Sequence, residues 1–221
     1  HYQPDTQKEV YYEFFNELDS AVVALIGYIE EKPESNGFAR FDILLDGKYS
    51  SWVKFANSLR LRLAMRLASI APDKARLEIE KIKENDYGFF ERGSEKVAVS
   101  TKSGYINPLG ELNLVWNETY MNASMESILT GYDDPRLKAY FLPCTDEKFR
   151  GEYLGMRQGT CVAHNHYAGL SRLSVTQATD APLMTASEVW FLRAEAALRG
   201  WTDEDEENCY RNGVMTSFEQ W

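Results

Sequence analysis

Three side chains of metal-ligating type lie close together in the second half of the sequence: Cys161, His164 and His166. A C-x-x-H-x-H spacing can hold a transition metal, but a closed zinc site needs four ligands and no fourth is evident nearby. Any histidine-based relay to a nucleophile would also have to use this cluster, because the chain has only 3 histidines and one of them is residue 1. A metal-dependent hydrolase is therefore one hypothesis, and a loop that binds no metal is the favoured one.

Other catalytic patterns are missing from the sequence. It contains no G-x-S-x-G elbow, H-E-x-x-H helix, phosphate-binding loop or dinucleotide fingerprint. The acidic run at 203–207 lacks the alternation of a calcium loop and suits the first turn of a helix, where the helix dipole favours carboxylates. Glu188 and Glu195 stand two turns apart on one helix, and Glu195 can pair with Arg199 at i,i+4. We therefore predict no catalytic residue, no metal, no cofactor and no enzymatic activity.

Aromatic, amide and guanidinium side chains gather instead in two segments without regular periodicity. A flat ring offers a face to the C–H surface of a sugar, and planar polar groups can bond its hydroxyls. The alternative for each of these side chains, taken singly, is packing in a core, which is the commoner role of an aromatic residue. The predicted ligand-binding residues are Tyr105, Trp116, Tyr120, Tyr153, Arg157, Asn165, His166 and Tyr167.

Composition and charge limit the class of partner. The 221 residues carry 24 Lys and Arg against 34 Asp and Glu, a formal net charge of −10. Such a chain repels phosphate, so nucleic acid is excluded as a partner. Hydrophobic residues make up 44% of the sequence, enough for a folded core. The longest apolar run, 21–26, is too short to cross a bilayer.

Periodicity predicts helices at both ends of the chain. Thr6 and Glu9 form a capping box before a helix over 7–27. Ser50 or Ser51 caps a second helix that Pro72 ends, and a third covers 73–85. Near the C-terminus, Thr185 and Glu188 form a second capping box before a helix that Gly200 closes, and Thr202 caps the last helix. The bulky residues assigned to the helical core are Trp52, Trp190, Trp201 and Phe191.

The middle of the chain has a different character. Residues 41–47 suit a short extended piece before a turn, and residues 89–123 and 143–183 read as irregular segments rich in glycine. A short helix over 123–130, closed by Gly131, and another that begins at Pro135 separate the two. The prediction is an all-α fold in which antiparallel helix pairs, similar to tetratricopeptide units, are interrupted by long irregular loops.

The second helix carries four cations, Lys54, Arg60, Arg62 and Arg66, that lie largely off its apolar face. They could line a groove for an anionic ligand. The favoured alternative is that their stems cover apolar surface while their heads pair with the abundant carboxylates.

Several phrases of the sequence resemble successive signatures of one family. They are WVKFANSLRLRLAMRLASIAP (52–72), DDPRLKAYFLP (133–143) with RGEYLGMRQG (150–159), PLMTASEVWFLRAEAALRGW (182–201) and CYRNGVMTSFEQW (209–221). In this order they are similar to the SusD/RagB family, the surface nutrient-binding lipoproteins of Bacteroidetes outer membranes. The phrases fall on scaffold helices and turns, so the resemblance transfers no binding residue.

The resemblance implies a SusD-like helical fold and capture of an oligosaccharide or other nutrient glycan. It also implies a SusC-like TonB-dependent transporter as partner and an outer-membrane, surface-exposed location through a lipid anchor that this chain does not contain. We expect one domain over 1–221, incomplete at both ends, with a helical scaffold at 6–88 and 185–221 and a loop-rich insert at 89–183. The alternative function is a helical-repeat adaptor that binds a protein or peptide.

Overall fold

The computed structural model describes residues 4–101 and 104–220. The described part of the chain forms two compact units, one made of residues 4–98 and 182–220 and the other of residues 99–101 and 104–181. A two-stranded sheet of β1 (Lys96–Val99) and β2 (Ala181–Thr185) lies where the chain passes from the first unit to the second and back.

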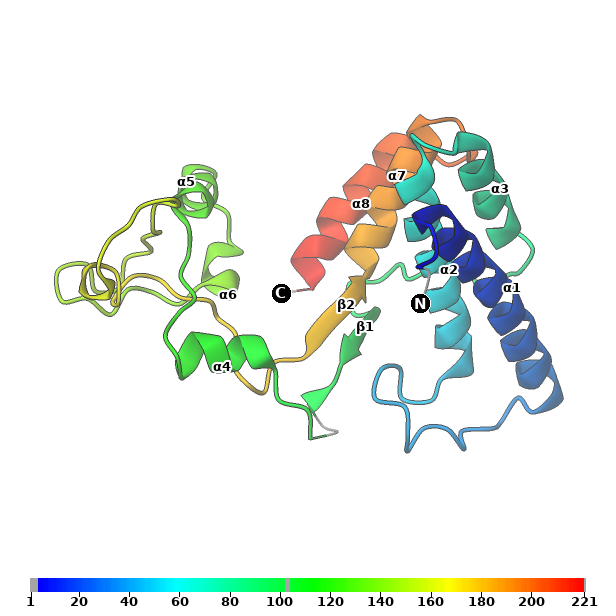
Figure 1. The fold of residues 1–221 in the computed structure, drawn as a ribbon, viewed down its shortest axis with the longest axis horizontal. Helices are drawn as coiled ribbons and strands as arrows, with labels where there is room; N and C mark the ends of the chain where they lie inside the picture. Colours follow the sequence, from blue (N-terminus) through cyan, green and yellow to red (C-terminus); the bar gives the residue numbers. More distant parts are fainter. Residues whose placement is uncertain (1–3, 102–103, 221) are drawn as a thin grey trace. The chain divides into compact units, whose positions relative to one another are not determined.

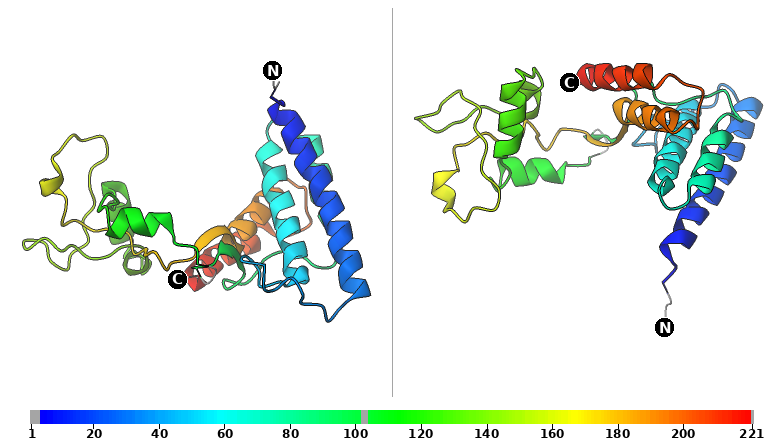
Figure 2. Two further views of the ribbon diagram at one scale, coloured as in Figure 1. Left: turned by 60° about the horizontal axis from the view of Figure 1, so that its bottom comes forward. Right: turned by 90° about the horizontal axis from the view of Figure 1, so that it is seen from above.

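The first unit is helical (Figure 1). In it α2 packs against α1 and α3, and α7 packs against α8 and α2. Figures 1 and 2 show α7 and α8 side by side as a hairpin. These packed pairs confirm the predicted helical fold class. The helices are α1 (Gln7–Glu31), α2 (Tyr49–Leu67), α3 (Pro72–Ile82), α7 (Ala186–Leu198) and α8 (Glu206–Glu219).

The first helix begins where the sequence predicts and runs one turn further. The Thr6 hydroxyl accepts the Glu9 N–H, and the Glu9 carboxylate accepts the Thr6 N–H at 2.8 Å, which confirms the capping box. Gly27 does not end the helix, because an isolated glycine only weakens a helix. Only Pro33, two residues beyond Glu31, makes continuation unfavourable.

One core joins the helices of the first unit. Phe15 of α1 is fully buried, and the apolar faces of α2, α3 and α7 meet around it. Trp52 and Trp201 pack against this core as predicted, whereas Phe191 is 38% exposed and the prediction that it lies in the core is wrong. The buried residues of the core include Leu61, Ala64, Met65, Ile79, Ile82, Met184, Val189 and Ala196.

Three predicted helix caps are wrong. Lys48 precedes α2 without a side-chain cap, so neither Ser50 nor Ser51 has that role. Thr185 stands at the N-cap of α7 without a capping bond, and Asp205 rather than Thr202 caps α8 through the Asn208 N–H at 2.7 Å. Gly200 follows α7 with φ +69°, as predicted for a helix end.

Tertiary ion pairs explain the lost capping box of α7. The Glu188 carboxylate, predicted to bond Thr185, instead receives both Nε and Nη2 of Arg62 at 2.6 Å each. The bidentate pair gives the Glu188 carboxylate two charge-assisted bonds to a cation, whereas the capping box would give it one, to a neutral backbone N–H. The pairing interpretation of the cations on α2 is confirmed for Lys54, which meets Glu95 at 2.8 Å, and for Arg60 and Arg62.

The segment 41–47 consists of turns and not of the expected extended piece. The buried Asp42 carboxylate accepts the backbone N–H groups of Leu44, Leu45 and Gly47 at 2.8–3.1 Å, and the indole N–H of Trp52 at 2.8 Å. A carboxylate that bonds its own following amides folds the chain into a turn, because these donors are no longer free to pair with a strand.

The second unit has short helices and a small core of its own. Met121, Leu129 and Phe141 are buried together. Isolated bridges pair Tyr120 with Arg172, Asn122 with Met156 and Phe141 with Leu173. The elements are α4 (Pro108–Leu114), α5 (Ala123–Gly131), α6 (Leu137–Tyr140) and the 3-10 turn η2 (His164–His166).

Two segments expected to be irregular contain regular elements. The segment 89–123 contains β1 and α4. The segment 143–183 contains η2 and the start of β2. The sequence signal for α4 is the Asn107–Pro108 pair, since Asn107 accepts the Leu109 N–H as N-cap and Pro108 occupies the first turn. Within the described residues, no helix is both long and apolar enough to span a membrane.

Candidate functional site

Three aromatic rings meet in the second unit. The rings of Tyr120 and His164 both lie 5.1 Å from that of Tyr167, with interplanar angles of 86° and 82°. Tyr120 and His164 lie 6.4 Å apart at 67°. Edge-to-face contacts at these separations are favourable and fix the ring orientations. The rings come from chain segments more than 40 residues apart, so only the tertiary fold brings them together.

Asn117 and Arg172 fix the turn that carries Tyr120 of this aromatic cluster. The Tyr120 hydroxyl donates to the Asn117 carbonyl oxygen at 2.9 Å. The Arg172 guanidinium Nη1 donates to Asn117 Oδ1 at 2.9 Å and to the Asn113 carbonyl oxygen at 3.2 Å. Asn117 has φ +57°, a left-handed conformation that asparagine adopts more readily than most residues. The turn that carries Tyr120 is therefore fixed by side-chain bonds.

A buried amide of α4 bonds residues 173–175, which follow Arg172 in the chain. Asn113 is fully buried, and its Nδ2 donates to the Leu173 and Val175 carbonyl oxygens at 2.8 Å each. The Thr119 hydroxyl donates to Asn113 Oδ1 at 2.6 Å. Gly110 packs so tightly there that a Cβ would lie 2.2 Å from the Thr176 carbonyl carbon. Bonds and close packing therefore hold α4 against residues 173–176, next to Arg172.

An open groove of about 380 Å³ adjoins Tyr120. The Met156 N–H donates to the Met121 carbonyl oxygen at 2.7 Å, so a backbone bridge joins the two segments that line it. Burial raises the pKa of the Tyr120 hydroxyl, which keeps it neutral and able to donate or accept near neutral pH. The lining combines carboxylate, amide, guanidinium and thioether groups and consists of Glu118, Tyr120, Met121, Asn122, Met156, Arg157, Gln158 and Gly159.

The structure brings some of the predicted ligand-binding residues together. Tyr120 belongs to both the cluster and the groove, Tyr167 to the cluster and Arg157 to the groove. Trp116 precedes Asn117 directly and is 61% exposed, so its ring is available to a ligand. These four residues form the candidate site with His164.

The remaining predictions fall elsewhere in the second unit. Tyr153 packs against the small core, which is a structural position. Tyr105 is half-buried, and Asn165 and His166 are exposed in or beside the turn η2. Within the described residues, none of these three has a hydrogen bond or ring contact to the cluster.

The sequence prediction missed three residues of the site: Asn117, Arg172 and, as an aromatic partner, His164. Asn117 lies between Trp116 and Tyr120 in the sequence, and this position between two predicted binding residues is the signal that could have identified it. From the sequence, His164 is a candidate metal ligand or member of a histidine relay, but no three His, Cys, Asp or Glu side chains of the described ranges converge on one point. Arg172 gave no signal, because its partner lies 55 positions away.

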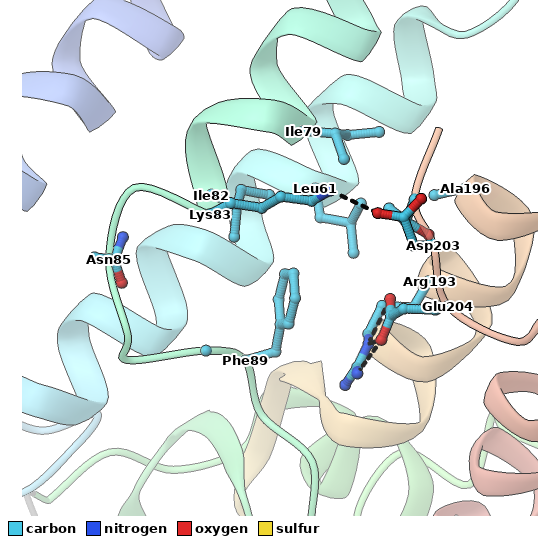
Figure 3. Close-up of a pocket in the computed structure, with 12 residues that line it drawn as sticks. Leu61, Ile79, Ile82, Lys83, Asn85, Phe89, Arg193, Ala196, Asp203 and Glu204 are labelled. Carbon is cyan, nitrogen blue, oxygen red and sulfur yellow. Dashed lines mark hydrogen bonds and ion pairs between the residues drawn. The ribbon is translucent and has the colours of Figure 1, made fainter. Parts of the chain in front are cut away.

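A second pocket, of about 360 Å³, lies in the first unit (Figure 3). The Phe89 ring and the side chains of Leu61 and Ile82 surround its interior, and ion pairs flank it. Arg193 bonds Glu204, and its guanidinium lies 3.8 Å above the Trp190 ring centre. Burial alone would lower the pKa of Arg193, but the bonds to Glu204 and Glu91 outweigh it and raise the pKa. The interior of this pocket is apolar and Arg193 and Glu204 at its edge are paired, whereas polar and charged side chains line the groove beside Tyr120.

Comparison with known proteins identifies relatives over the whole chain. Residues 1–221 match the family described as "SusD-like: Susd and RagB outer membrane lipoprotein". No curated protein matches the chain significantly. Among solved structures, a SusD homologue from Bacteroides vulgatus shares 43% identity at a TM-score of 0.86. A chitin-binding SusD homologue from Flavobacterium johnsoniae shares 38% at 0.89, and a SusD-like protein from Bacteroides thetaiotaomicron shares 32% at 0.86.

The matches cover nearly all of this chain but less than half of each related chain. Each comparison covers 98% of this chain but 45% of the related chain. The chain thus spans about half the length of the solved relatives.

Proposed function

The chain belongs to the SusD/RagB family of outer-membrane lipoproteins, and from that premise we propose that it is a non-enzymatic glycan-binding component of an outer-membrane nutrient uptake system. The observation that carries the proposal is the candidate site of the second unit. Trp116, which directly precedes Asn117, is exposed, and a groove lined by amide and guanidinium groups adjoins Tyr120, which forms an aromatic cluster with His164 and Tyr167. Flat ring faces beside planar donors suit a sugar ring and its hydroxyls.

The charge of the second unit supports a neutral ligand. Residues 99–181 hold seven Lys and Arg against nine Asp and Glu, so most of the net charge of −10 lies on the first unit. A nearly balanced surface neither attracts nor repels an uncharged oligosaccharide. The chitin-binding homologue from Flavobacterium johnsoniae makes chitooligosaccharides the first ligands to test.

The wider role follows from the family rather than from the site. We propose that the full-length protein is lipid-anchored and exposed at the cell surface, and that it passes its ligand to a SusC-like TonB-dependent transporter. Support comes from the family's description as outer-membrane lipoproteins.

Isothermal titration of the full-length protein against a panel of oligosaccharides tests the proposal. We expect one glycan class to bind and Trp116→Ala to weaken it at least about tenfold, since loss of a stacked aromatic ring costs about 1–2 kcal/mol. Tyr132→Ala is the matched control, because Tyr132 is 84% exposed in the same unit and does not line the groove. Failure of every glycan to bind, or equal losses in the two variants, contradicts the proposal.

A helical adaptor is the second candidate function. One face of α4 favours it, because Leu109, Leu112 and the following Val115 are 39–63% exposed while polar Asn113 is buried. Exposed apolar side chains in a row can mark a protein contact. Co-purification with a transporter, together with no affinity for any sugar, would favour this function over the first.

A further inference from the structure

Arg66 is a cation of α2 that the ion pairs of the first unit do not explain. The other three cations of this helix, Lys54, Arg60 and Arg62, each meet a carboxylate at 2.6–2.8 Å. Among the described residues, no carboxylate pairs with Arg66, which is exposed in the last turn of the helix. An unpaired guanidinium carries five N–H donors and a permanent charge. Arg66 is therefore free to receive an anion.

A cavity of about 260 Å³ lies against Arg66. The first two turns of α1 line it together with the end of α2 and the turn that follows. The described residues of this lining include a second cation, Lys8, and no carboxylate. In contrast, Glu204 lines the pocket of Figure 3, and Glu118 lines the groove beside Tyr120. In a chain with a net charge of −10, a cavity lined by two cations and no carboxylate favours an anion.

The charge of Lys8 is also available. The carboxylate of its neighbour Glu9 is engaged at the helix cap, where it accepts the Thr6 N–H at 2.8 Å and the Thr6 hydroxyl at 2.7 Å. Lys8 forms no ion pair in the described ranges, and its Nζ lies 5.4 Å from the centre of the Tyr12 ring. A contact with an aromatic face leaves the cation its charge. Neither cation of the cavity is thus neutralised by a partner.

The rest of the lining suits the body of a small ligand. The rings of Tyr11 and Tyr12 pack against the core of the first unit, and their hydroxyls form no hydrogen bond within the described residues. Leu67 and Ile70 add aliphatic surface. Pockets for drug-sized ligands measure about 300–1,000 Å³, so this cavity takes a smaller molecule, about one ring with its substituents.

We propose that this cavity, the Arg66 pocket, binds a carboxylate carried on a single ring, and that Arg66 and Lys8 receive the charge. A guanidinium matches the two oxygens of a carboxylate with parallel N–H donors, and the tyrosine rings contact the ligand body. The acidic unit of a glycan and an aromatic acid share this chemistry. The pocket lies in the first unit and shares no lining residue with the groove beside Tyr120, so the proposal does not rest on the proposed function.

Isothermal titration of the full-length protein with two carboxylates and their neutral counterparts tests the proposal. Glucuronate is compared with glucose, and benzoate with benzyl alcohol. We expect at least one carboxylate to bind, at least about tenfold more tightly than its counterpart, and to bind more weakly as salt is added. Binding of glucuronate alone assigns the pocket to acidic sugars, and binding of benzoate alone assigns it to aromatic acids. No binding of either carboxylate, or equal binding of a carboxylate and its counterpart, overturns the proposal.

Arg66 is tested by loss and partial rescue. We expect Arg66→Met to weaken the bound carboxylate about tenfold, and Arg66→Lys, which keeps the charge without the planar fork, to recover part of the loss. The side chain is exposed and unpaired among the described residues, so the fold does not depend on it. Arg211→Met is the control, because Arg211 of α8 is exposed and does not line the pocket. Equal losses in Arg66→Met and Arg211→Met overturn the proposal.

Methyl NMR locates the bound carboxylate. We expect it to shift the signals of Leu67 and Ile70, which line the Arg66 pocket. Shifts of Met121 and Met156 instead would place the ligand in the groove beside Tyr120 and overturn the proposal. If the carboxylate binds at Leu67 and Ile70 while no neutral glycan binds the protein, the Arg66 pocket stands and the proposed function fails.

Discussion

Arg60 of α2 and Glu78 of α3 form an ion pair that is buried inside the first unit, with the Glu78 carboxylate fully excluded from solvent. Arg60 also bonds Asp19 of α1 at 2.6 Å, and Lys74 bonds Glu78 at 2.6 Å. One guanidinium thus links three helices. A buried pair of this kind contributes little compared with an apolar replacement of both partners, but loss of one partner leaves an unpaired buried charge.

We expect Arg60→Met to lower the free energy of unfolding by about 2–3 kcal/mol, because Glu78 loses its buried partner while Lys74, at 2.6 Å, still offsets its charge. Urea denaturation followed by circular dichroism measures the change. Arg76→Met is the control: the Arg76–Glu80 pair of the same helix α3 is exposed on both sides, and its loss should cost less than about 1 kcal/mol. Equal losses in the two variants would contradict the assignment.

Asp42 should make stability depend on pH. Burial alone raises the pKa of its carboxyl, but the bonds from Leu44, Trp52, Leu45 and Gly47 outweigh burial and lower the pKa. The ionised group therefore stabilises the fold above its unfolded pKa of about 3.9, and the contribution is lost as the pH falls through the lower folded value.

We expect Asp42→Asn to cost about 2 kcal/mol at neutral pH, because it replaces charge-assisted bonds with weaker ones. The difference from the parent should shrink as the pH falls below about 4. Urea titrations at several pH values, monitored by tryptophan fluorescence, give both quantities. A difference that stays constant down to the lowest pH would show that the charge has no part in it.

Two glycines of the second unit should respond oppositely to alanine. A Cβ at Gly110 would lie 2.2 Å from backbone at Thr176, whereas at Gly131, in the last turn of α5, it would meet no atom within 4 Å. We expect Gly110→Ala to lose more than about 2 kcal/mol through overpacking and Gly131→Ala to gain about 0.5 kcal/mol through helix propensity. Thermal unfolding compares them, and similar behaviour would refute the packing of α4 on the returning chain.

The three cysteines should differ in reactivity. All are free; Cys161 is exposed, and Cys144 and Cys209 are buried. Burial raises the pKa of the Cys209 thiol and so lowers its thiolate fraction. We expect iodoacetamide to modify Cys161 in the native protein and all three after unfolding, as read by mass spectrometry of tryptic peptides. Rapid native labelling of Cys209 would contradict its burial in α8.

Sequence patterns predicted local structure well where the interaction is local. The capping box of Thr6 and Glu9 and the closing role of Gly200 depend on neighbours within four residues, and both are confirmed. The same logic fails for Thr185, because Glu188 has a stronger partner in Arg62, 126 positions away. The residues near position 188 do not indicate that Arg62 competes for the Glu188 carboxylate.

The candidate site follows the same division. The sequence by itself determined the helical class, the family and the presence of aromatic side chains in the two central segments, because periodicity, motifs and composition are properties of residue order. Only the tertiary structure decided that Tyr120 and Tyr167 meet, that Tyr153 is packed away, and that Arg172 orients Asn117. These outcomes depend on how segments more than 40 residues apart pair through the backbone, and a one-dimensional pattern carries no record of that pairing.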